Sequence, residues 1–318
     1  DMVAKYIGAQ ESAHVRLNRL GSGDWQRAKA KVKTSVKDIA KELIALYAKR
    51  KRTKGIAFDP DDDMCRQFAD SFEYEETEGQ STAIADIRRD MEASYPMDRL
   101  LCGDVGYGKT EVALRAAFKA VMSGYQVAVL VPTTILAFQH LQTFQSRLRG
   151  FPVEVDMLSR FRTPTQQAAS LRKLRRGDTD IIIGTHRLIS KDVTFSNLGL
   201  IIVDEEQRFG VEQKEKLKQI APDVDVLTLT ATPIPRTLNM AMGGIVDMSV
   251  LEEAPGLRSP VQTYVTEHDD GILLEAMRRE MRRGGQVFYL KNRIESVYET
   301  AAKIAQKLVW VGTVEGHI

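Results

Sequence analysis

The chain has 318 residues, and 45 Lys and Arg against 43 Asp and Glu give a formal net charge of +2. Hydrophobic residues make up 43% and charged residues 28% of the sequence, which is typical of a globular protein and excludes a disordered or collagen-like chain. Two cysteines, Cys65 and Cys102, are too few for a disulfide framework or a cysteine-rich zinc site, and no apolar run reaches the roughly 18 residues of a membrane span.

Charge is unevenly distributed near the start of the chain. Residues 26–54 hold eleven Lys or Arg and two Asp or Glu, a net charge of +9, whereas residues 59–78 hold nine Asp or Glu and one Arg, a net charge of −8. The near-zero total therefore says little about nucleic-acid partners. Apolar residues recur at three- and four-residue steps from Trp25 to Tyr47, which predicts one long basic helix. Its basic face is a solvated surface, a nucleic-acid contact or a docking surface for another domain, and the sequence leaves the three open.

A second, shorter helix is predicted to begin near Pro60 and to carry Met64, Phe68 and Phe72. Beyond it, short apolar segments and helical segments alternate. Strands are predicted at residues 99–102, 127–131, 180–183, 200–203 and 226–229, and helices at 110–123, 134–148, 165–175 and 213–220. The strands lack polar alternation, as in a parallel sheet that is buried on both faces. This predicts a doubly wound α/β fold with ligands at the carboxyl ends of the strands.

Residues 252–260 contain two prolines and a glycine and are predicted to be a linker. Strands at 261–266 and 286–290 and helices at 271–283 and 296–307 should follow, which is too little for an independent domain. The chain begins at Asp1 without an initiator Met or a signal-peptide pattern, so we expect a segment of a longer, cytoplasmic protein. The predicted divisions are residues 1–55, 56–252 and 253–318.

The sharpest motif is a phosphate-binding loop of the form G-x-x-x-x-G-K-[ST] between a predicted strand and a predicted helix. Its residues are Gly103, Asp104, Val105, Gly106, Tyr107, Gly108, Lys109 and Thr110. Glycines let backbone N–H groups point at phosphate oxygens, and the helix N-terminus adds partial positive charge. Lys109 should reach the β- and γ-phosphates, and the Thr110 hydroxyl should reach Mg²⁺. The motif predicts ATP and Mg²⁺ as cofactors.

Two further strand ends carry matching chemistry. Asp204 and Glu205 follow the predicted strand at 200–203, where Asp204 is the expected metal partner and Glu205 the expected base for the attacking water. Thr230 and Thr232 end the strand at 226–229, where their hydroxyls can bond both the acidic strand end and the γ-phosphate region.

Together these motifs resemble the first RecA-like lobe of a superfamily 2 helicase or translocase motor. The resemblance implies that Phe72 stacks on adenine and Gln80 reads its edge, and that Gln207, Thr230 and Thr232 couple the nucleotide site to movement. It also implies DNA-backbone contacts at three other strand ends. These residues are Pro132, Thr133, Thr134, Ser159, Arg160, Thr185, His186 and Arg187.

Within that superfamily the sequence is similar to bacterial transcription-repair coupling factors over roughly residues 1–308. The resemblance rests on residues 97–104, 204–210 and 230–242, and the basic helix resembles that family's relay helix. It implies an ATP-dependent double-stranded DNA translocase that displaces stalled RNA polymerase and promotes nucleotide excision repair, with RNA polymerase and repair proteins bound by parts outside this chain. No membrane partner is expected.

The pattern also departs from that family. Residues 1–55 are expected to hold only the end of the polymerase-binding module and the relay-type helix. Most of the second lobe, including its arginine-bearing motif, is not in this sequence, and residues 309–318 do not match. The isolated chain is therefore expected to be a weak or inactive ATP hydrolase. Two other functions stay open: a RecG-like branched-DNA helicase motor, which shares the Arg208-Phe209-Gly210 run, and a nucleotide-binding interaction module without turnover.

Overall fold

The computed structural model describes residue 30 and residues 52–205, 209, 222–232, 246–256, 261–290 and 296–308. Contacts divide the chain into two units, Asp1–Arg258 and Ser259–Ile318, which are treated separately below. Several predictions concern residues outside the described part. They are most of the basic helix, the helix at 213–220, Gln207 and the tail at 309–318.

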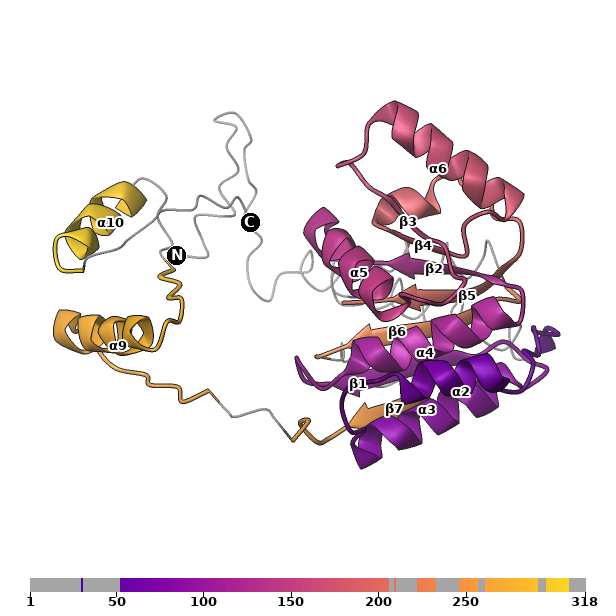
Figure 1. Cartoon of the computed structure of the whole chain (residues 1–318), viewed down its shortest axis with the longest axis horizontal. Coiled ribbons are helices and arrows are strands. Elements are labelled where there is room, and N and C mark those ends of the chain that lie inside the picture. Colours follow the sequence, from indigo (N-terminus) through magenta and orange to yellow (C-terminus); the bar gives the residue numbers. More distant parts are fainter. Residues whose placement is uncertain are drawn as a thin grey trace. The chain divides into compact units, whose positions relative to one another are not determined.

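The first unit is built on a seven-stranded sheet with the order β3-β4-β2-β5-β6-β1-β7, in which every pairing is parallel (Figure 1). The strands are β1 (Asp98–Gly103), β2 (Gln126–Leu130), β3 (Val155–Leu158), β4 (Ile181–Gly184), β5 (Leu198–Val203), β6 (Asp225–Thr230) and β7 (Asp247–Leu251). The predicted parallel α/β fold is confirmed, and all five predicted strands of this unit are present. Strands β3 and β7, which lie at the two edges, were not predicted.

Helices cover both faces of this sheet, which explains why its central strands are apolar throughout. Strand β2 contributes to a separate hydrophobic core on each face of the sheet. Val127 and Val129 pack into one core, and Ala128 and Leu130 pack into the other. The first core is closed by α2 (Asp63–Asp70), α3 (Glu78–Met91), α4 (Lys109–Met122) and α5 (Thr134–Arg147). The second is closed by α6 (Pro164–Arg176) and the short 3-10 helix η2 (His186–Ile189). Removing apolar surface on both sides stabilises the sheet at about 25 cal/mol per Å².

The acidic segment near the start of this unit forms two capped helices. Asp62 caps α2 by accepting a hydrogen bond from the Cys65 amide, and Thr77 and Gln80 form a reciprocal capping box at the start of α3. Met64 and Phe68 lie on α2 as predicted, but α2 ends at Asp70, so Phe72 lies beyond the helix. Acidic side chains in the first turns suit the positive helix ends.

Buried polar side chains also join α3 to the sheet. Arg99 of β1 is 5% exposed, and its guanidinium donates to Asp90 of α3 at 2.7 Å and to Ser249 of β7 at 2.8 Å. Arg99 therefore links α3 to β1 and adds a side-chain contact to the backbone pairing of β1 with the edge strand β7. The pair is buried on both sides, since the Asp90 side chain is 9% exposed.

Arg99→Met should lower the free energy of unfolding by about 3–5 kcal/mol, because it leaves a buried carboxylate without its partner. Urea denaturation measures the change. Arg89→Met is the matched control, since Arg89 pairs with Asp86 at 2.7 Å from a side chain that is 70% exposed, and exposed pairs contribute little. Equal denaturation midpoints for the two variants would contradict this role of Arg99.

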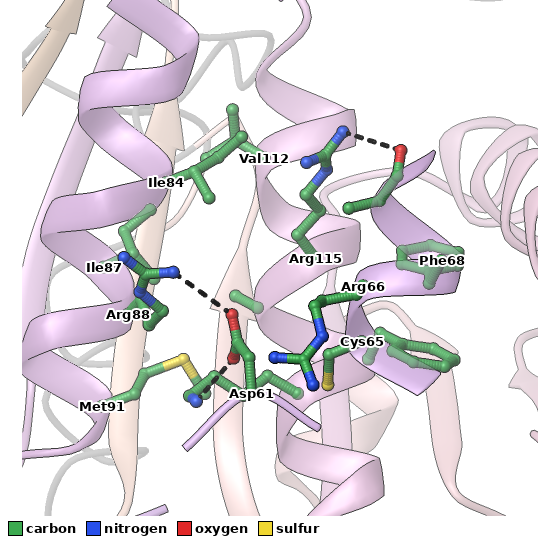
Figure 2. Close-up of a pocket in the computed structure, with 14 residues that line it drawn as sticks. Asp61, Cys65, Arg66, Phe68, Ile84, Ile87, Arg88, Met91, Val112 and Arg115 are labelled. Carbon is green, nitrogen blue, oxygen red and sulfur yellow. Dashed lines mark hydrogen bonds and ion pairs between the residues drawn. The ribbon is translucent and has the colours of Figure 1, made fainter. Parts of the chain in front are cut away.

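A pocket of about 190 Å³ lies between α2, α3 and α4 (Figure 2). Its wall includes Ile87, and at its rim Asp61 pairs with Arg88 at 3.5 Å and with Lys119 at 2.7 Å. Burial raises the pKa of the Cys65 thiol to about 12, so this thiol is protonated at neutral pH. None of the predicted site residues lines the pocket.

The second unit contains two helices among its described residues, α9 (Asp270–Arg282) and α10 (Val297–Ala305). Both were predicted to within a few residues. The strands predicted at 261–266 and 286–290 are wrong, because these residues are described and form no ladder. Val265 is 94% exposed and Phe288 is 93% exposed, so these β-prone residues have no sheet to pack in. No helix in the described part of the chain has the length and apolar character to cross a membrane.

Candidate functional site

The predicted phosphate loop connects β1 to α4. Gly106 and Gly108 have φ angles of 83° and 82°, in the left-handed region that glycine adopts without steric cost. Gly108 is the N-cap of α4 and no described side chain caps this helix, so its first amide groups face the loop. Such amides, together with the helix dipole, form an anion-binding surface.

The ammonium group of Lys109 is held at this loop by two backbone carbonyl groups of the loop. Its Nζ donates to the carbonyl of Gly103 at 2.6 Å and to the carbonyl of Asp104 at 2.9 Å. Burial lowers the pKa of Lys109, and the negative charges of Asp204 and Glu205 act in the opposite direction. The acidic strand end therefore lies close enough to act electrostatically on the loop lysine.

Strand order explains this proximity. Strand β6 lies between β1 and β5, and all three are parallel, so their carboxyl ends lie along the same side of the sheet. This side is the carboxyl edge, and it is distinct from the edge strands β3 and β7. Cys102 pairs with Thr230, and Val203 pairs with Thr228. The Thr230–Thr232 segment thus lies between the phosphate loop and Asp204, as its predicted coupling role requires. Thr230 is 1% exposed.

Asp204 and Glu205 form a sharp turn directly after β5. The Asp204 amide donates to the carbonyl of Leu130 at 2.9 Å, and the Glu205 amide donates to Oδ1 of Asp204 at 2.8 Å. Glu205 has a φ of 53°, and it is the one non-glycine residue in the left-handed region within the described ranges. Such a conformation costs about 1–3 kcal/mol and is found most often at functional sites.

The donor set suits Mg²⁺ held mainly by phosphate oxygens and water. Within the described ranges no three His, Cys, Asp or Glu side chains converge on one point, so a cage made of protein ligands is absent there. Magnesium typically uses one or two carboxylates together with substrate phosphates. Asp204 and the half-buried Thr110 supply a carboxylate and a hydroxyl of that kind.

The predicted adenine-binding residues lie in a segment that contacts the loop. The Gln80 amide nitrogen donates to the Tyr107 carbonyl at 2.9 Å, and its oxygen accepts from the Thr77 amide at 3.1 Å. Gln80 is 3% exposed, so it ties the start of α3 to the phosphate loop. A Cβ atom at Gly108 would lie 2.2 Å from the Gln80 nitrogen, and the φ of 82° already favours glycine there.

Two arginines lie close to the Phe72 ring. The guanidinium of Arg115 lies 5.7 Å from its ring centroid and that of Arg147 lies 5.5 Å from it. Arg147 also donates to the Phe68 carbonyl at 2.8 Å and to Glu111 at 2.8 Å. Sequence patterns did not reveal these two arginines, because both contacts join distant parts of the chain. They fix the segment whose aromatic ring is predicted to stack on adenine.

The predicted DNA-contact residues follow β2, β4 and β3, on the other half of the same sheet edge. These residues differ in how far their side chains are exposed to solvent. Arg160 and His186 are exposed, whereas Ser159 is 1% and Thr185 is 4% exposed. Arg187 pairs with Asp192 at 2.7 Å. The remaining three, Pro132, Thr133 and Thr134, are half-buried, and the Thr133 hydroxyl caps α5.

Buried hydroxyls are poorly placed to reach a DNA backbone, so this geometry favours Arg160 and His186 as contacts over Ser159 and Thr185. Among the described histidines, however, the one that touches the acidic strand end is His140. Its Nε2 lies 2.8 Å from Oδ2 of Asp204. Sequence reasoning missed His140 because it lies outside every recognised motif.

One edge of a parallel sheet thus gathers a phosphate loop, a carboxylate pair and a hydroxyl-bearing strand end, an arrangement that belongs to the P-loop NTPases with a RecA-like fold. Comparison with known proteins narrows this class. The model of the DEAD/DEAH box helicases matches residues 77–241, just over half of the chain, and the chain belongs to that family.

Several relatives are similar over most of this chain. It is 56% identical over 305 residues to the transcription-repair-coupling factor of Bacillus subtilis (strain 168). The matched region covers 96% of this chain and 26% of that relative. The coupling factor of Staphylococcus aureus (strain USA300) is 55% identical over 299 residues, covering 94% of the chain and 26% of the relative. The chain therefore spans about a quarter of the length of these relatives.

A solved structure of RecG bound to a three-way DNA junction is also similar. It has a TM-score of 0.68 and 36% sequence identity, and the match covers 84% of this chain and 37% of that one. The MrfA helicase bound to DNA shares the fold, with a TM-score of 0.52 at 15% identity.

Proposed function

We propose that this chain is the ATP-binding motor segment of a bacterial transcription-repair coupling factor. The observation that carries the proposal is the 56% identity to such a factor across 96% of the chain. In this proposal the whole protein hydrolyses ATP to translocate on double-stranded DNA, displaces stalled RNA polymerase and promotes nucleotide excision repair. RNA polymerase and the repair proteins bind parts of the protein outside this chain.

Each residue at the sheet edge has a role in this proposal. The loop amides and Lys109 bind the β- and γ-phosphates, Thr110 and Asp204 hold Mg²⁺, and Glu205 accepts a proton from the attacking water. Bound Mg²⁺ supplies charge neutralisation at the phosphates. Phe72 stacks on adenine, and Gln80 reads the adenine edge when its amide exchanges the bond to the Tyr107 carbonyl for one to the base.

Movement and DNA binding use the rest of that edge. Thr230, Thr232 and Gln207 couple nucleotide state to movement. Arg160 and His186 contact the DNA backbone without reading its sequence, and the buried Ser159 and Thr185 do not reach it. We assign residues 56–252 to the first motor lobe and residues 253–318 to a linker and the start of a second.

A RecG-like motor is the second candidate, and the 36% identity to RecG supports it. Identity to the coupling factors is higher, at 55–56%, and it extends over more of the chain. A third candidate, an interaction module that binds nucleotide without turnover, differs from the first two in catalysis.

ATP turnover with and without duplex DNA separates these candidates. We expect this chain alone to hydrolyse ATP poorly, and a protein of the relatives' full length that carries it to be stimulated by DNA. A transition-state arginine from a second lobe is typically worth about 10³–10⁵ in rate. DNA-stimulated turnover by the 318-residue chain at the rate of the longer protein would contradict the expectation that hydrolysis needs an arginine from a second lobe. Absence of turnover in the longer protein would favour the non-catalytic module.

A further inference from the structure

His140 and Asp204 form a contact that joins the two halves of the sheet edge. His140 lies on α5, the helix that follows β2, and Asp204 directly follows β5. Strands β2 and β5 are neighbours, and they mark the border between the predicted DNA half and the predicted nucleotide half. The 2.8 Å distance between Nε2 of His140 and Oδ2 of Asp204 bridges that border.

The hydrogen bond defines the orientation of the carboxylate. Oδ1 of Asp204 accepts from the Glu205 amide at 2.8 Å, and Oδ2 accepts from His140. Both side chains are largely buried, with 14% of Asp204 and 9% of His140 exposed. An ionised carboxylate only accepts hydrogen bonds, so Nε2 of His140 carries the proton. Each carboxylate oxygen retains a lone pair for a further ligand.

The other side of the imidazole ring has no such partner. Nδ1 of His140 is buried and has no hydrogen bond to any described residue. Phe144 packs edge-on against the ring, at 6.0 Å between centroids. A buried polar atom without a partner costs stability, so an apolar side chain would serve packing better at this position. The bond to Asp204 is therefore the hydrogen bond that holds the His140 ring within the described part of the chain.

We propose that His140 is a positioning residue for Asp204, and this inference rests on the proposed function of the site. The imidazole fixes the orientation of the carboxylate, so that Asp204 is held ready for Mg²⁺. Partners of metal-binding side chains typically contribute 10–100-fold to metal affinity or activity. The bond also links that carboxylate to α5, whose first turn holds Thr133 and Thr134.

The test measures how much Mg²⁺ is needed for a fluorescent ATP analogue to bind, in a protein of the relatives' full length that carries this sequence. His140→Leu removes the donor and keeps an apolar side chain of similar size. We expect it to raise the half-saturating Mg²⁺ concentration roughly 10- to 100-fold, with nucleotide binding in EDTA unchanged. His140→Gln retains an N–H donor near the position of Nε2, so its Mg²⁺ requirement should stay close to that of the unchanged protein.

Leu141→Ala is the control for packing, because Leu141 is a buried neighbour on the same helix whose apolar side chain cannot hold a carboxylate. It should lower the melting temperature and leave the Mg²⁺ requirement unchanged. A His140→Leu protein with an unchanged Mg²⁺ requirement would overturn the inference, as would a Gln variant that is impaired as strongly as the Leu variant.

An Asp204→Asn arm separates this inference from the proposed function. If Asp204→Asn raises the Mg²⁺ requirement and His140→Leu does not, the metal role of Asp204 stands and the positioning role of His140 is wrong. If Asp204→Asn has no effect on the Mg²⁺ requirement, the metal assignment itself is wrong and the role of His140 falls with it. When both single variants have effects, His140→Leu should add nothing further in the Asp204→Asn background, since its action runs through that carboxylate.

Discussion

Lys109→Ala is expected to bind ATP roughly 10- to 100-fold more weakly than the unchanged chain, because a charge-assisted hydrogen bond is worth about 1.5–3 kcal/mol. In the structure, Nζ of Lys109 donates to the Gly103 and Asp104 carbonyls at 2.6 and 2.9 Å, so the ammonium is already held at the loop. A bound phosphate replaces neutral carbonyl acceptors with charged oxygens. The Lys109→Ala variant has no ammonium group to bond the phosphate oxygens, and only the loop amides remain to bind them.

Titration of a fluorescent ATP analogue measures the loss. Lys173→Ala is a matched control, because it makes the same chemical change at an exposed lysine of α6 whose Nζ lies 3.5 Å from Glu154. This control should bind ATP normally, and melting temperatures of both variants show whether the fold is intact. Undiminished ATP binding by Lys109→Ala would mean that the 103–110 loop is not the phosphate site.

Local sequence was sufficient to predict the parts of this site that form within one short segment. The 103–110 loop needs only a strand, glycines and a helix start in succession, and the structure has β1, Gly106, Gly108 and α4 in that order. The central strands were predictable because both of their faces are buried, which leaves an uninterrupted apolar run. The carboxyl-edge position of Asp204 followed from the parallel arrangement.

Edge strands and isolated segments were not predictable in this way. Strand β7 reads Asp-Met-Ser-Val-Leu with exposed and buried positions mixed, so it lacks the apolar signature of the centre. Residues 261–266 are rich in β-prone residues and form no strand, because a strand requires a hydrogen-bonded partner as well as β-prone residues. Helix α3 was missed although its Thr77–Gln80 capping box is visible in the sequence.

Side-chain contacts between distant segments were beyond prediction for a similar reason. His140 and Asp204 are 64 positions apart, and Arg147 and Phe68 are 79 apart. Neither spacing follows from helix or strand periodicity. These contacts depend on which strand lies next to which, and the order β2-β5 was known only from the assembled sheet.

Glu205→Gln should reduce ATP turnover by about 10²–10⁴-fold, the usual contribution of a general base, while leaving ATP affinity unchanged. The amide has nearly the same shape as the carboxylate and cannot accept the proton of the attacking water. Glu205 has a φ of 53°, and glutamine tolerates this left-handed conformation no better or worse, so the strained turn after β5 is retained in the variant. The substitution therefore changes proton acceptance and little else.

Single-turnover hydrolysis with duplex DNA, in a protein of the relatives' full length, measures this effect apart from nucleotide binding. Glu154→Gln is the control, because Glu154 is an exposed carboxylate whose side chain is 55% accessible. If Glu205→Gln loses turnover and retains its ATP affinity, and Glu154→Gln retains both, then Glu205 is the base. Turnover close to that of the control would assign proton acceptance to a group other than Glu205.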